Sequence, residues 1–293
     1  MRYFIIGGSG LLGTELVKNL ARNNEVSFTY NSNPIRVEDC DSYRVDLRKS
    51  DAVVEILERL RPEVVIHAAA PPNVDWHERE REEAYHINVL TTRAIAEKCR
   101  LLGALMVYTS TAFVFPDTNQ VFKEEDIPAP INFYGVTKLG GELAVSANLD
   151  HIIVRTDQIY GWTLPEQKKS FVLNVLETLS RNERVEVCQD WYNSPTYVKD
   201  LSNMITELVK SDRRGIYHVV GNTFLNRVEW AKYIATAFGK DPSLVVGIES
   251  KTLNLPARRP NARISNEKIQ KELGVKLKTI MEGLDNMKKG MTK

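Results

Sequence analysis

The chain has 293 residues, of which 43% are hydrophobic and 26% are charged, and its 39 basic and 38 acidic side chains give a formal net charge of +1. This is the composition of a globular protein with room for one large domain or one and a half smaller ones. The even mixture of charges argues against a nucleic-acid-binding arm and against a patch for anionic membranes, and the apolar runs are too short to span a bilayer.

Short apolar runs alternate with longer helical stretches in the first half of the chain. Because strands separated by helices form βαβ crossovers, this alternation predicts a parallel sheet covered by helices on both faces. We expect strands at 3–6, 26–30, 64–67, 105–109 and 152–155. We expect helices at 11–21, at 51–60 with Ser50 as its cap, within 78–100 as one long polar helix, and at 132–147.

The pattern changes after about residue 161. Proline-bearing segments interrupt the alternation, and the helices are separated by short strands. We expect helices at 171–180, 198–210 and 228–238, and strands at 185–188 and 216–220. This half predicts a smaller α/β lobe, and the whole chain an α/β protein with a doubly wound parallel sheet.

The cysteine and histidine patterns bear on compartment and metals. The three cysteines are scattered, odd in number and form no CxxC pair, which predicts reduced thiols in a cytoplasmic protein. The five histidines show no metal-binding spacing, so we predict no metal. The first residues, 1–6, lead directly into a glycine loop and lack the features of a signal peptide.

A glycine-rich loop directly follows the first expected strand and opens the first expected helix. Glycine allows a tight turn, and the helix N-terminus adds backbone N–H groups and a partial positive charge, which suit the pyrophosphate of a dinucleotide. The GxxGxxG spacing is typical of short-chain dehydrogenases/reductases. The residues expected to bind the cofactor here are Gly7, Ser9, Gly10, Leu11, Leu12 and Gly13.

The end of the second strand indicates which dinucleotide binds. An acidic residue there would accept a hydrogen bond from the ribose 2′-hydroxyl of NAD. The chain has no carboxylate at this point and instead has Asn31, followed by Arg36. A neutral donor and an arginine suit a 2′-phosphate, so we predict NADP, with NAD as the alternative if Arg36 is only a surface side chain.

Two further segments are expected along the cofactor. One comes shortly before the helix expected at 51–60 and flanks the adenine. The other ends the strand expected at 64–67, where small side chains let a cofactor lie close to the backbone. These residues are Asp46 and Leu47 in the first segment, and Ala68, Ala69 and Ala70 in the second.

Tyr134 and Lys138 are four residues apart and therefore lie on one face of a helix. None of the other tyrosines has a lysine at this spacing. An ammonium beside a phenol favours the phenolate, so we expect the pKa of Tyr134 to fall from about 10 towards neutral pH. Such a tyrosine exchanges a proton with a substrate oxygen, and Thr111 is expected to hydrogen-bond the same oxygen. Asn88 is expected either to hold a proton-relay water or to pack between helices.

These residues resemble the extended short-chain dehydrogenase/reductase superfamily, and within it the dTDP-4-dehydrorhamnose reductase family. That family also includes the regulatory β subunit of methionine adenosyltransferase. The resemblance runs over nearly the whole chain as an ordered series of motifs. The series is 61–70, 74–75, 110–115 (similar to the S-T-D-Y-V-F of the family), 130–138, 155–156, 194–196 and 259–260.

The resemblance implies a Rossmann-type NADP-binding domain at 1–160 that carries the catalytic residues, and a smaller substrate-binding lobe at 161–293 whose segments interleave with the first. It also implies that Thr111, Tyr134 and Lys138 reduce a 4-keto sugar nucleotide, and that the protein is a homodimer. The residues implied to contact substrate are Asp75, Ala112, Phe113, Gln158 and Arg259, with Lys168, Lys169 and Asn174 near its nucleotide half.

Three departures from the family pattern fall where the sugar ring is expected. Ala112-Phe113 replaces Asp-Tyr, Asp157-Gln158 replaces Ser-Trp, and Pro71-Pro72 replaces a His-Thr pair. Changed polar partners change which sugar hydroxyls are satisfied, so we expect an altered sugar. Two alternatives stay open at this point. One is a sugar-nucleotide epimerase, and the other is a non-catalytic NADP-binding regulatory subunit like methionine adenosyltransferase β.

Overall fold

The computed structural model describes residues 1–148 and 150–290. A seven-stranded sheet lies at the centre of this part, and all of its neighbouring strands run parallel. The fold class predicted from the alternation is thereby confirmed. The strand order across the sheet is β12 (Gly215–His218), β7 (His151–Thr156), β5 (Leu105–Thr111), β4 (Val64–His67), β1 (Arg2–Ile6), β2 (Glu25–Tyr30) and β3 (Cys40–Arg44).

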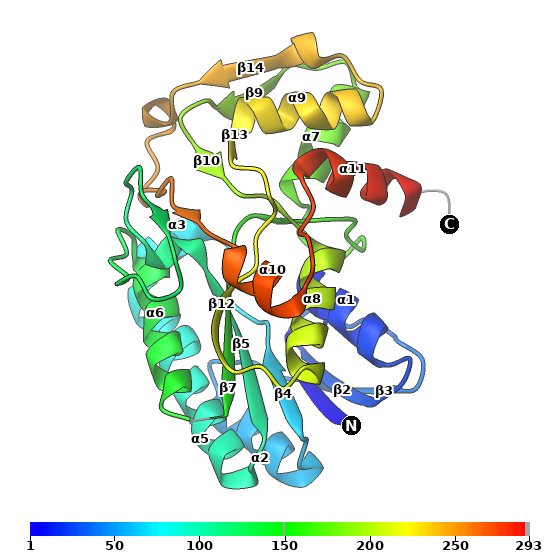
Figure 1. The fold of residues 1–293 in the computed structure, drawn as a ribbon, viewed down its shortest axis with the longest axis vertical. Coiled ribbons are helices and arrows are strands. Elements are labelled where there is room, and N and C mark those ends of the chain that lie inside the picture. Colours follow the sequence, from blue (N-terminus) through cyan, green and yellow to red (C-terminus); the bar gives the residue numbers. More distant parts are fainter. Residues whose placement is uncertain (149, 291–293) are drawn as a thin grey trace.

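Helices cover both faces of the sheet (Figure 1). Successive strand residues point to opposite faces, so Tyr3 and Ile5 belong to one buried cluster while Phe4 and Ile6 belong to another. The first cluster is shared with α1 (Leu11–Leu20) and α8 (Val198–Lys210), and the second with α2 (Ser50–Leu60), α5 (Thr92–Leu102) and α6 (Phe133–Ser146).

The expected cap of α2 is wrong. Ser50 is the first helical residue, and Lys49 occupies the N-cap position without a side-chain hydrogen bond. The helix is fixed by burial instead, because Val53 and Leu57 lie one turn apart in the second cluster.

The single long helix expected within 78–100 is also wrong. The segment between β4 and β5 consists of α3 (Val74–Arg79), α4 (Arg81–Tyr85), a π-helix η1 (His86–Thr91) and α5. Glu80 interrupts the first turns because its backbone angles, φ −108° and ψ 54°, are not helical. The π-helical turn matters for the site because it contains Asn88.

A smaller lobe stands beyond one end of the sheet (Figure 1). It contains α7 (Phe171–Ser180), α9 (Arg227–Ala237) and α11 (Ile280–Lys289), with two strand pairs, β9 (Val185–Cys188) with β14 (Val245–Ile248) and β10 (Tyr192–Asn193) with β13 (Leu225–Asn226). Its core includes the buried Trp230, which packs against Phe171 with ring centroids 4.5 Å apart.

Two elements expected in this lobe return to the sheet. The predicted strand at 216–220 is β12, which pairs with the outer edge of β7, and the predicted helix at 198–210 is α8, which packs against α1. The remaining short elements are β6 (Val121–Phe122), β8 (Ile159–Tyr160), β11 (Thr196–Tyr197), β15 (Arg263–Ile264), α10 (Glu267–Leu273), η2 (Ala112–Val114), η3 (Pro242–Leu244) and η4 (Ser250–Leu253).

Among the described residues, no helix has the length and apolar character needed to cross a membrane. The same residues contain no group of three or more His, Cys, Asp or Glu side chains placed to hold a metal ion. Cys40, Cys99 and Cys188 are free thiols.

Candidate active site

The glycine loop connects β1 to α1 at the carboxyl edge of the sheet. Gly7 has φ +85°, and a Cβ there would lie 2.7 Å from the Cβ of Ala69, so this position requires glycine. A Cβ on Gly13 would clash with the carbonyl oxygen of Gly7. A Cβ on Gly10 would instead meet only that oxygen, at 3.4 Å. The loop is therefore closely packed beneath and open beside Gly10.

The N-terminus of α1 lacks a capping side chain. Gly10 is its N-cap, and the first turn has no acidic residue. By contrast, α9 and α11 both begin with a capping box whose glutamate lies at the third helical position. The first N–H groups of α1 consequently have no side chain to satisfy them and lie at the open side of the loop. This arrangement fits an anionic group such as a pyrophosphate.

The residues predicted to select the cofactor follow β2. Asn31 and Arg36 are exposed. Among the described residues, the Arg36 guanidinium has no hydrogen-bond or ion-pair partner. Asp46 accepts hydrogen bonds from Arg48 at 2.9 and 2.5 Å, which holds the pKa of Asp46 below its usual value. Part of the Asp46 carboxylate is thus already satisfied by a neighbour, which leaves fewer acceptor positions for an adenosine.

Small residues follow β4 beside the glycine loop. Ala68 packs against the first buried cluster and Ala69 against the second, directly below Gly7. Ala70 is half-buried next to them. Leu47 contributes to the second cluster, and its carbonyl accepts a hydrogen bond from the Thr91 hydroxyl at 2.7 Å.

Thr111, Tyr134 and Lys138 lie on β5 and α6, and β4 is the one strand between β5 and β1, which leads into the glycine loop. Thr111 is the last residue of β5, and Tyr134 and Lys138 lie one turn apart on α6. A Cβ on Gly135 would clash with the carbonyl oxygen of Phe113, so only glycine lets α6 approach the segment after β5 this closely. A hydrogen bond between Thr111 and Tyr134 is the result.

Burial, rather than the lysine, sets the protonation of Tyr134. Burial raises the pKa of Tyr134 to about 12, which contradicts the decrease predicted from the spacing. Burial also lowers the pKa of Lys138 to about 7, with Glu142 opposing that shift. The Lys138 Nζ lies 4.1 Å from the centre of the Tyr108 ring. A lysine that is partly neutral at pH 7 stabilises a phenolate less, so Tyr134 keeps its proton and can donate it.

Asn88 and His77 support the tyrosine from behind. The Asn88 amide nitrogen lies 3.0 Å from the Thr137 hydroxyl and 3.2 Å from His77 Nε2. The Thr137 hydroxyl donates to the backbone carbonyl of Tyr134 at 2.9 Å, and the His77 ring packs edge-on against Tyr134 at 4.8 Å. These contacts support packing for Asn88, and the proton relay stays a prediction. His77 had no motif to mark it in the sequence.

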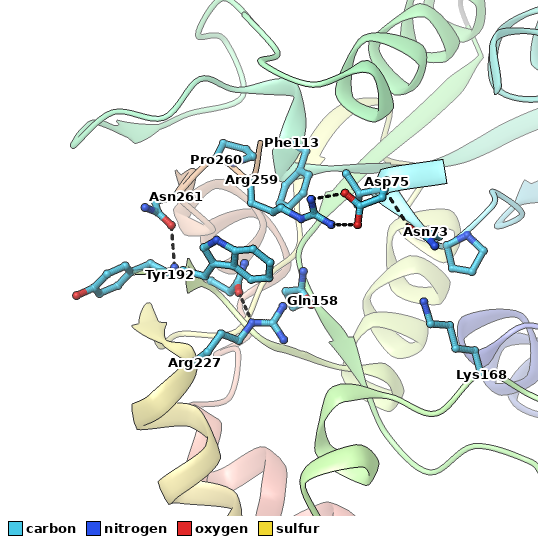
Figure 2. Close-up of a pocket in the computed structure, with 14 residues that line it drawn as sticks. Asn73, Asp75, Phe113, Gln158, Lys168, Tyr192, Arg227, Arg259, Pro260 and Asn261 are labelled. Carbon is cyan, nitrogen blue, oxygen red and sulfur yellow. Dashed lines mark hydrogen bonds and ion pairs between the residues drawn. The ribbon is translucent and has the colours of Figure 1, made fainter. Parts of the chain in front are cut away.

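A cavity of about 260 Å³ is lined in part by Phe113, whose ring packs near that of Tyr134 (Figure 2). Asp75, Phe113, Gln158, Lys168 and Arg259, all expected near substrate, line it. The structure adds residues that the sequence did not mark, among them Trp191, Asn193 and Arg227.

Three residues expected near substrate lie elsewhere. Ala112 is buried in a small apolar cluster with Val114 and Phe115, because the turn after β5 points its side chain inward. The Lys169 ammonium pairs with Glu177 at 2.6 Å. Asn174 is on α7, where its carbonyl accepts a hydrogen bond from the Thr178 hydroxyl.

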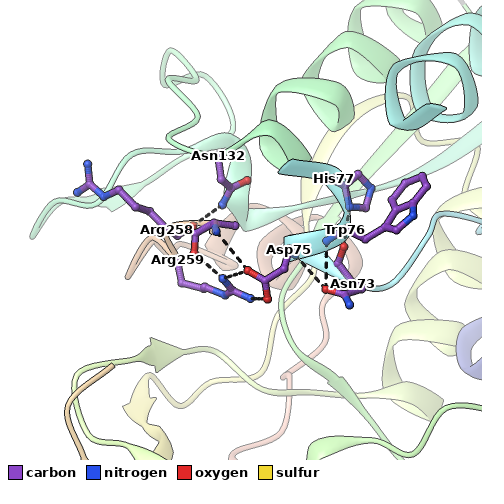
Figure 3. Close-up of polar contacts among 8 residues, drawn as sticks. Asn73, Asp75, Trp76, His77, Asn132, Arg258 and Arg259 are labelled. Atoms are coloured by element: carbon purple, nitrogen blue, oxygen red, sulfur yellow. Dashed lines mark hydrogen bonds and ion pairs between the residues drawn. The ribbon is translucent and has the colours of Figure 1, made fainter. Parts of the chain in front are cut away.

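Arg259 and Asp75 form a two-pronged ion pair across the cavity wall (Figure 3). The Arg259 Nη1 and Nη2 atoms donate to the two Asp75 carboxylate oxygens at 2.7 and 2.6 Å, and Nη1 also contacts the carbonyl of Ala257. The adjacent Arg258 carbonyl accepts from Asn132, the N-cap of α6, at 2.8 Å. Together these contacts fix the cavity wall to the helix that carries Tyr134. They also occupy most of the Arg259 donors.

A second arginine in the cavity is held differently. Arg227 Nε donates to Asn193 Oδ1 at 2.9 Å, and its guanidinium stacks over Phe171. Within residues 1–148 and 150–290, its terminal nitrogens have no hydrogen-bond partner. Asn193 in turn donates to Asp157 at 3.4 Å, and the Ser194 N–H donates to the same carboxylate at 2.8 Å. Burial raises the pKa of Asp157 to about 6 and lowers the pKa of Arg227 to about 10.

A parallel sheet with a glycine loop after β1, a Thr at the end of β5 and a Tyr–Lys pair on the following helix is typical of the extended short-chain dehydrogenase/reductase class. The chain belongs to the RmlD substrate binding domain family, whose model matches residues 1–292. The resemblance stated from the motifs is thereby confirmed.

Known proteins of two kinds are similar to the chain. Methionine adenosyltransferase 2 subunit beta of Pongo abelii is 31% identical over 288 residues, 95% of this chain and 84% of that protein. The dTDP-4-dehydrorhamnose reductase of Escherichia coli is 29% identical over 304 residues, 98% of this chain and 97% of that protein. The crystal structure of dTDP-4-dehydrorhamnose reductase from Bacillus anthracis in complex with NADP has a TM-score of 0.85 at 30% identity and covers 99% of both chains.

Proposed function

We propose that the protein is an NADP-dependent reductase of a 4-keto sugar nucleotide, with a sugar that differs from that of the dTDP-4-dehydrorhamnose reductases. The observation that carries this proposal is the hydrogen bond between Thr111 at the end of β5 and Tyr134 on α6, with Lys138 one turn further along that helix and Tyr134 protonated at neutral pH. A reduction needs a proton donor at the carbonyl oxygen, and a tyrosine with a pKa of about 12 carries that proton.

Each residue of the set has a role that follows from its position. The bound NADPH supplies the hydride. Tyr134 donates its proton to the carbonyl oxygen as negative charge develops there, and the Thr111 hydroxyl hydrogen-bonds the same oxygen. The ammonium form of Lys138, whose pKa is about 7, attracts the negative charge left on the Tyr134 phenolate once the proton has left.

The cofactor assignment is supported by the open N-terminus of α1 and by the residues after β2. Asn31 and Arg36 are exposed just after β2, and residues 26–37 contain no carboxylate. This arrangement suits a 2′-phosphate. The NADP bound to the Bacillus anthracis relative agrees with this choice.

The cavity supports a substrate with a phosphate-bearing half. Arg227 and Lys168 both line it, and neither is paired with a carboxylate among the described residues. Burial lowers the pKa of Arg227 to about 10, and the positive charge of Arg259 contributes to this decrease, so an anion between the two guanidinium groups is favoured. Asp157 is one of the departures from the family pattern at the expected sugar end. Its carboxylate accepts hydrogen bonds from the Asn193 side chain and the Ser194 N–H.

The regulatory alternative is supported by the 31% identity to a methionine adenosyltransferase β subunit. It requires dinucleotide binding but no proton donor. The intact set of Thr111, Tyr134 and Lys138 favours catalysis, because a protein that only binds the dinucleotide has no need to place a protonated phenol beside it.

The test is NADPH oxidation, followed by absorbance, with a panel of nucleotide-linked 4-keto-6-deoxy sugars. We expect turnover of at least one panel member and its loss in Tyr134→Phe. Interconversion of two sugars with no net NADPH consumption supports the epimerase alternative. NADPH binding without any change in the sugars supports the regulatory alternative and contradicts the proposed reaction.

A further inference from the structure

The segment between β8 and α7, residues 161–170, runs between the glycine loop and the substrate cavity. Its Gly161 would place a Cβ against Val198 and 3.8 Å from Leu11 of α1. The carbonyl of Glu166 accepts a hydrogen bond from the side chain of Asn33, which follows β2. Lys168 lines the cavity on the side of α1 (Figure 2). We call residues 163–169 the bridging segment because they contact both regions.

Gln167 is the central contact of the bridging segment. Its Nε2 donates to the Ser9 carbonyl and to the Thr14 hydroxyl, both at 2.8 Å. Its Oε1 accepts a hydrogen bond from the Leu164 N–H at 2.9 Å. The backbone N–H of Gln167 donates to the Leu164 carbonyl at 3.0 Å. The amide of this half-buried side chain is therefore fully used, and it joins positions 158 residues apart.

The contact with Thr14 continues into the glycine loop. The Thr14 hydroxyl donates to the Gly8 carbonyl at 3.3 Å, so Gln167 orients the carbonyls of both Ser9 and Gly8. A peptide carbonyl and the following N–H share one plane, so fixing these carbonyls fixes the direction of the next N–H groups. The first of these N–H groups belongs to Ser9, and the second, that of Gly10, donates to the Gly7 carbonyl at 3.0 Å and closes the turn of the loop.

We infer that Gln167 is a positioning residue that holds the glycine loop ready for the dinucleotide and, through the adjacent Lys168, links dinucleotide binding to substrate binding. This inference rests on the proposed binding of NADP. A dinucleotide that fixes the loop also fixes the bridging segment and with it Lys168, so each ligand raises the affinity for the other. The two increases are equal, because binding coupling is reciprocal.

The test uses two variants that remove the donors of Gln167 in different ways. Gln167→Glu keeps the shape and the Leu164 contact but cannot donate, and Gln167→Met is neutral and of similar length. NADPH affinity is measured by fluorescence titration, and dTDP and UDP affinities by calorimetry with and without NADPH. We expect NADPH to bind ~10-fold or more weakly to both variants, which is the effect of losing ordered hydrogen bonds next to an anion.

Coupling is the decisive readout. The coupling ratio is the affinity for the nucleoside diphosphate with NADPH divided by the affinity without it. In the wild-type protein this ratio is expected to be several-fold, and in both variants it is expected to fall to near one. Cleavage by trypsin after Lys168 and Lys169 is expected to slow when NADPH binds to the wild type, and less so in the variants. Glu166→Gln is the matched control, since among the described residues Glu166 makes its hydrogen bond through the backbone carbonyl, and this variant is expected to keep the wild-type ratio.

Weaker NADPH binding in Gln167→Glu alone indicates simple charge repulsion and overturns the inference. So does a wild-type coupling ratio of one, or a wild-type protein that does not bind NADPH. A drop in melting temperature of more than a few degrees in Gln167→Met, with a normal ratio at lower temperature, also overturns it. Since none of these measurements needs turnover, a failure of the proposed reaction with coupling intact is recognised separately.

Discussion

Two parts of the site are built in different ways. We call Thr111, Tyr134 and Lys138, which carry the proposed reaction, the reaction wall, and the residues that line the proposed substrate cavity the receiving wall. Thr111, Tyr134 and Lys138 lie at the ends of neighbouring elements of the central sheet, one strand and one helix. The receiving wall is formed by residues from several distant parts of the chain, including α3, the turn after β7, the bridging segment, β10, the start of α9 and the segment 259–261. The first wall therefore depends on local spacing and the second on long-range contacts.

This difference indicates where the molecule can change without loss of its chemistry. A residue held by one helix and one strand stays in place when distant segments vary. Arg227 is instead oriented by Asn193, which is oriented by Asp157, so a change at any of the three alters the receiving wall. Altered substrate choice with retained proton donation follows naturally from such a division.

The largest expected effect is on the reaction wall. Tyr134→Phe removes the proton donor and keeps the ring that packs against His77, so turnover is expected to fall ~10²–10⁴-fold while NADPH affinity is unchanged. The measurement is the rate of NADPH oxidation with saturating substrate. Tyr85→Phe, at an exposed tyrosine, is the control and should have no effect. An active Tyr134→Phe protein means that another group protonates the oxygen.

The reaction wall is also anchored by a buried ion pair. Arg155 of β7 donates to both carboxylate oxygens of Glu142 on α6, and the side chains are 2% and 4% exposed. Glu142→Gln leaves Arg155 buried without its counter-charge, so the free energy of unfolding is expected to fall by about 3–5 kcal/mol, measured by urea denaturation. Glu58→Gln, which breaks the surface pair with Lys98, should change it little. Equal effects of the two variants contradict the distinction.

The receiving wall is expected to make stability depend on pH through Asp157. Its pKa is about 6 in the folded protein and 3.8 ordinarily, so the folded state binds a proton more readily than the unfolded chain. The stability from this group is complete below about pH 4 and is lost as the pH rises through 6. Relative to Asp157→Asn, the wild type should therefore lose about 2–3 kcal/mol between pH 4 and 7.

Unfolding curves of both proteins across this range measure that loss. Asp41→Asn, at an exposed position, serves as the control and should follow the wild type at every pH. A constant difference between wild type and Asp157→Asn shows that Asp157 is ionised throughout, and places the cavity's negative charge on that residue.

The smallest effect separates the two arginines of the receiving wall. Arg227→Gln removes free donors from the cavity, so the affinity for dTDP or UDP is expected to fall about tenfold, or ~1.4 kcal/mol. Arg259→Gln should change this affinity less, because its donors are occupied by Asp75 and Ala257. Calorimetry on both variants gives the comparison, and the reverse order would assign the anion site to Arg259.

Sequence reasoning pointed to the groups that we propose for the reaction, because their arrangement follows from short spacing. The glycine loop, the pair Tyr134 and Lys138, and the position of Thr111 at a strand end could all be deduced because strand ends of a parallel sheet meet at one edge. It did not find Arg227 or Gln167. Their partners, Asn193 and Ser9, lie 34 and 158 positions away, and no local pattern connects them.

The sequence by itself determined the sheet, the loop and the choice of the side chains proposed to react, because hydrophobic period and residue spacing act over a few residues. Only the tertiary structure decided the protonation of those side chains and the membership of the cavity. The spacing of Tyr134 and Lys138 predicts a lowered tyrosine pKa, whereas burial raises it to about 12. Desolvation depends on every segment that covers a group, and that coverage exists only once distant parts of the chain have packed together.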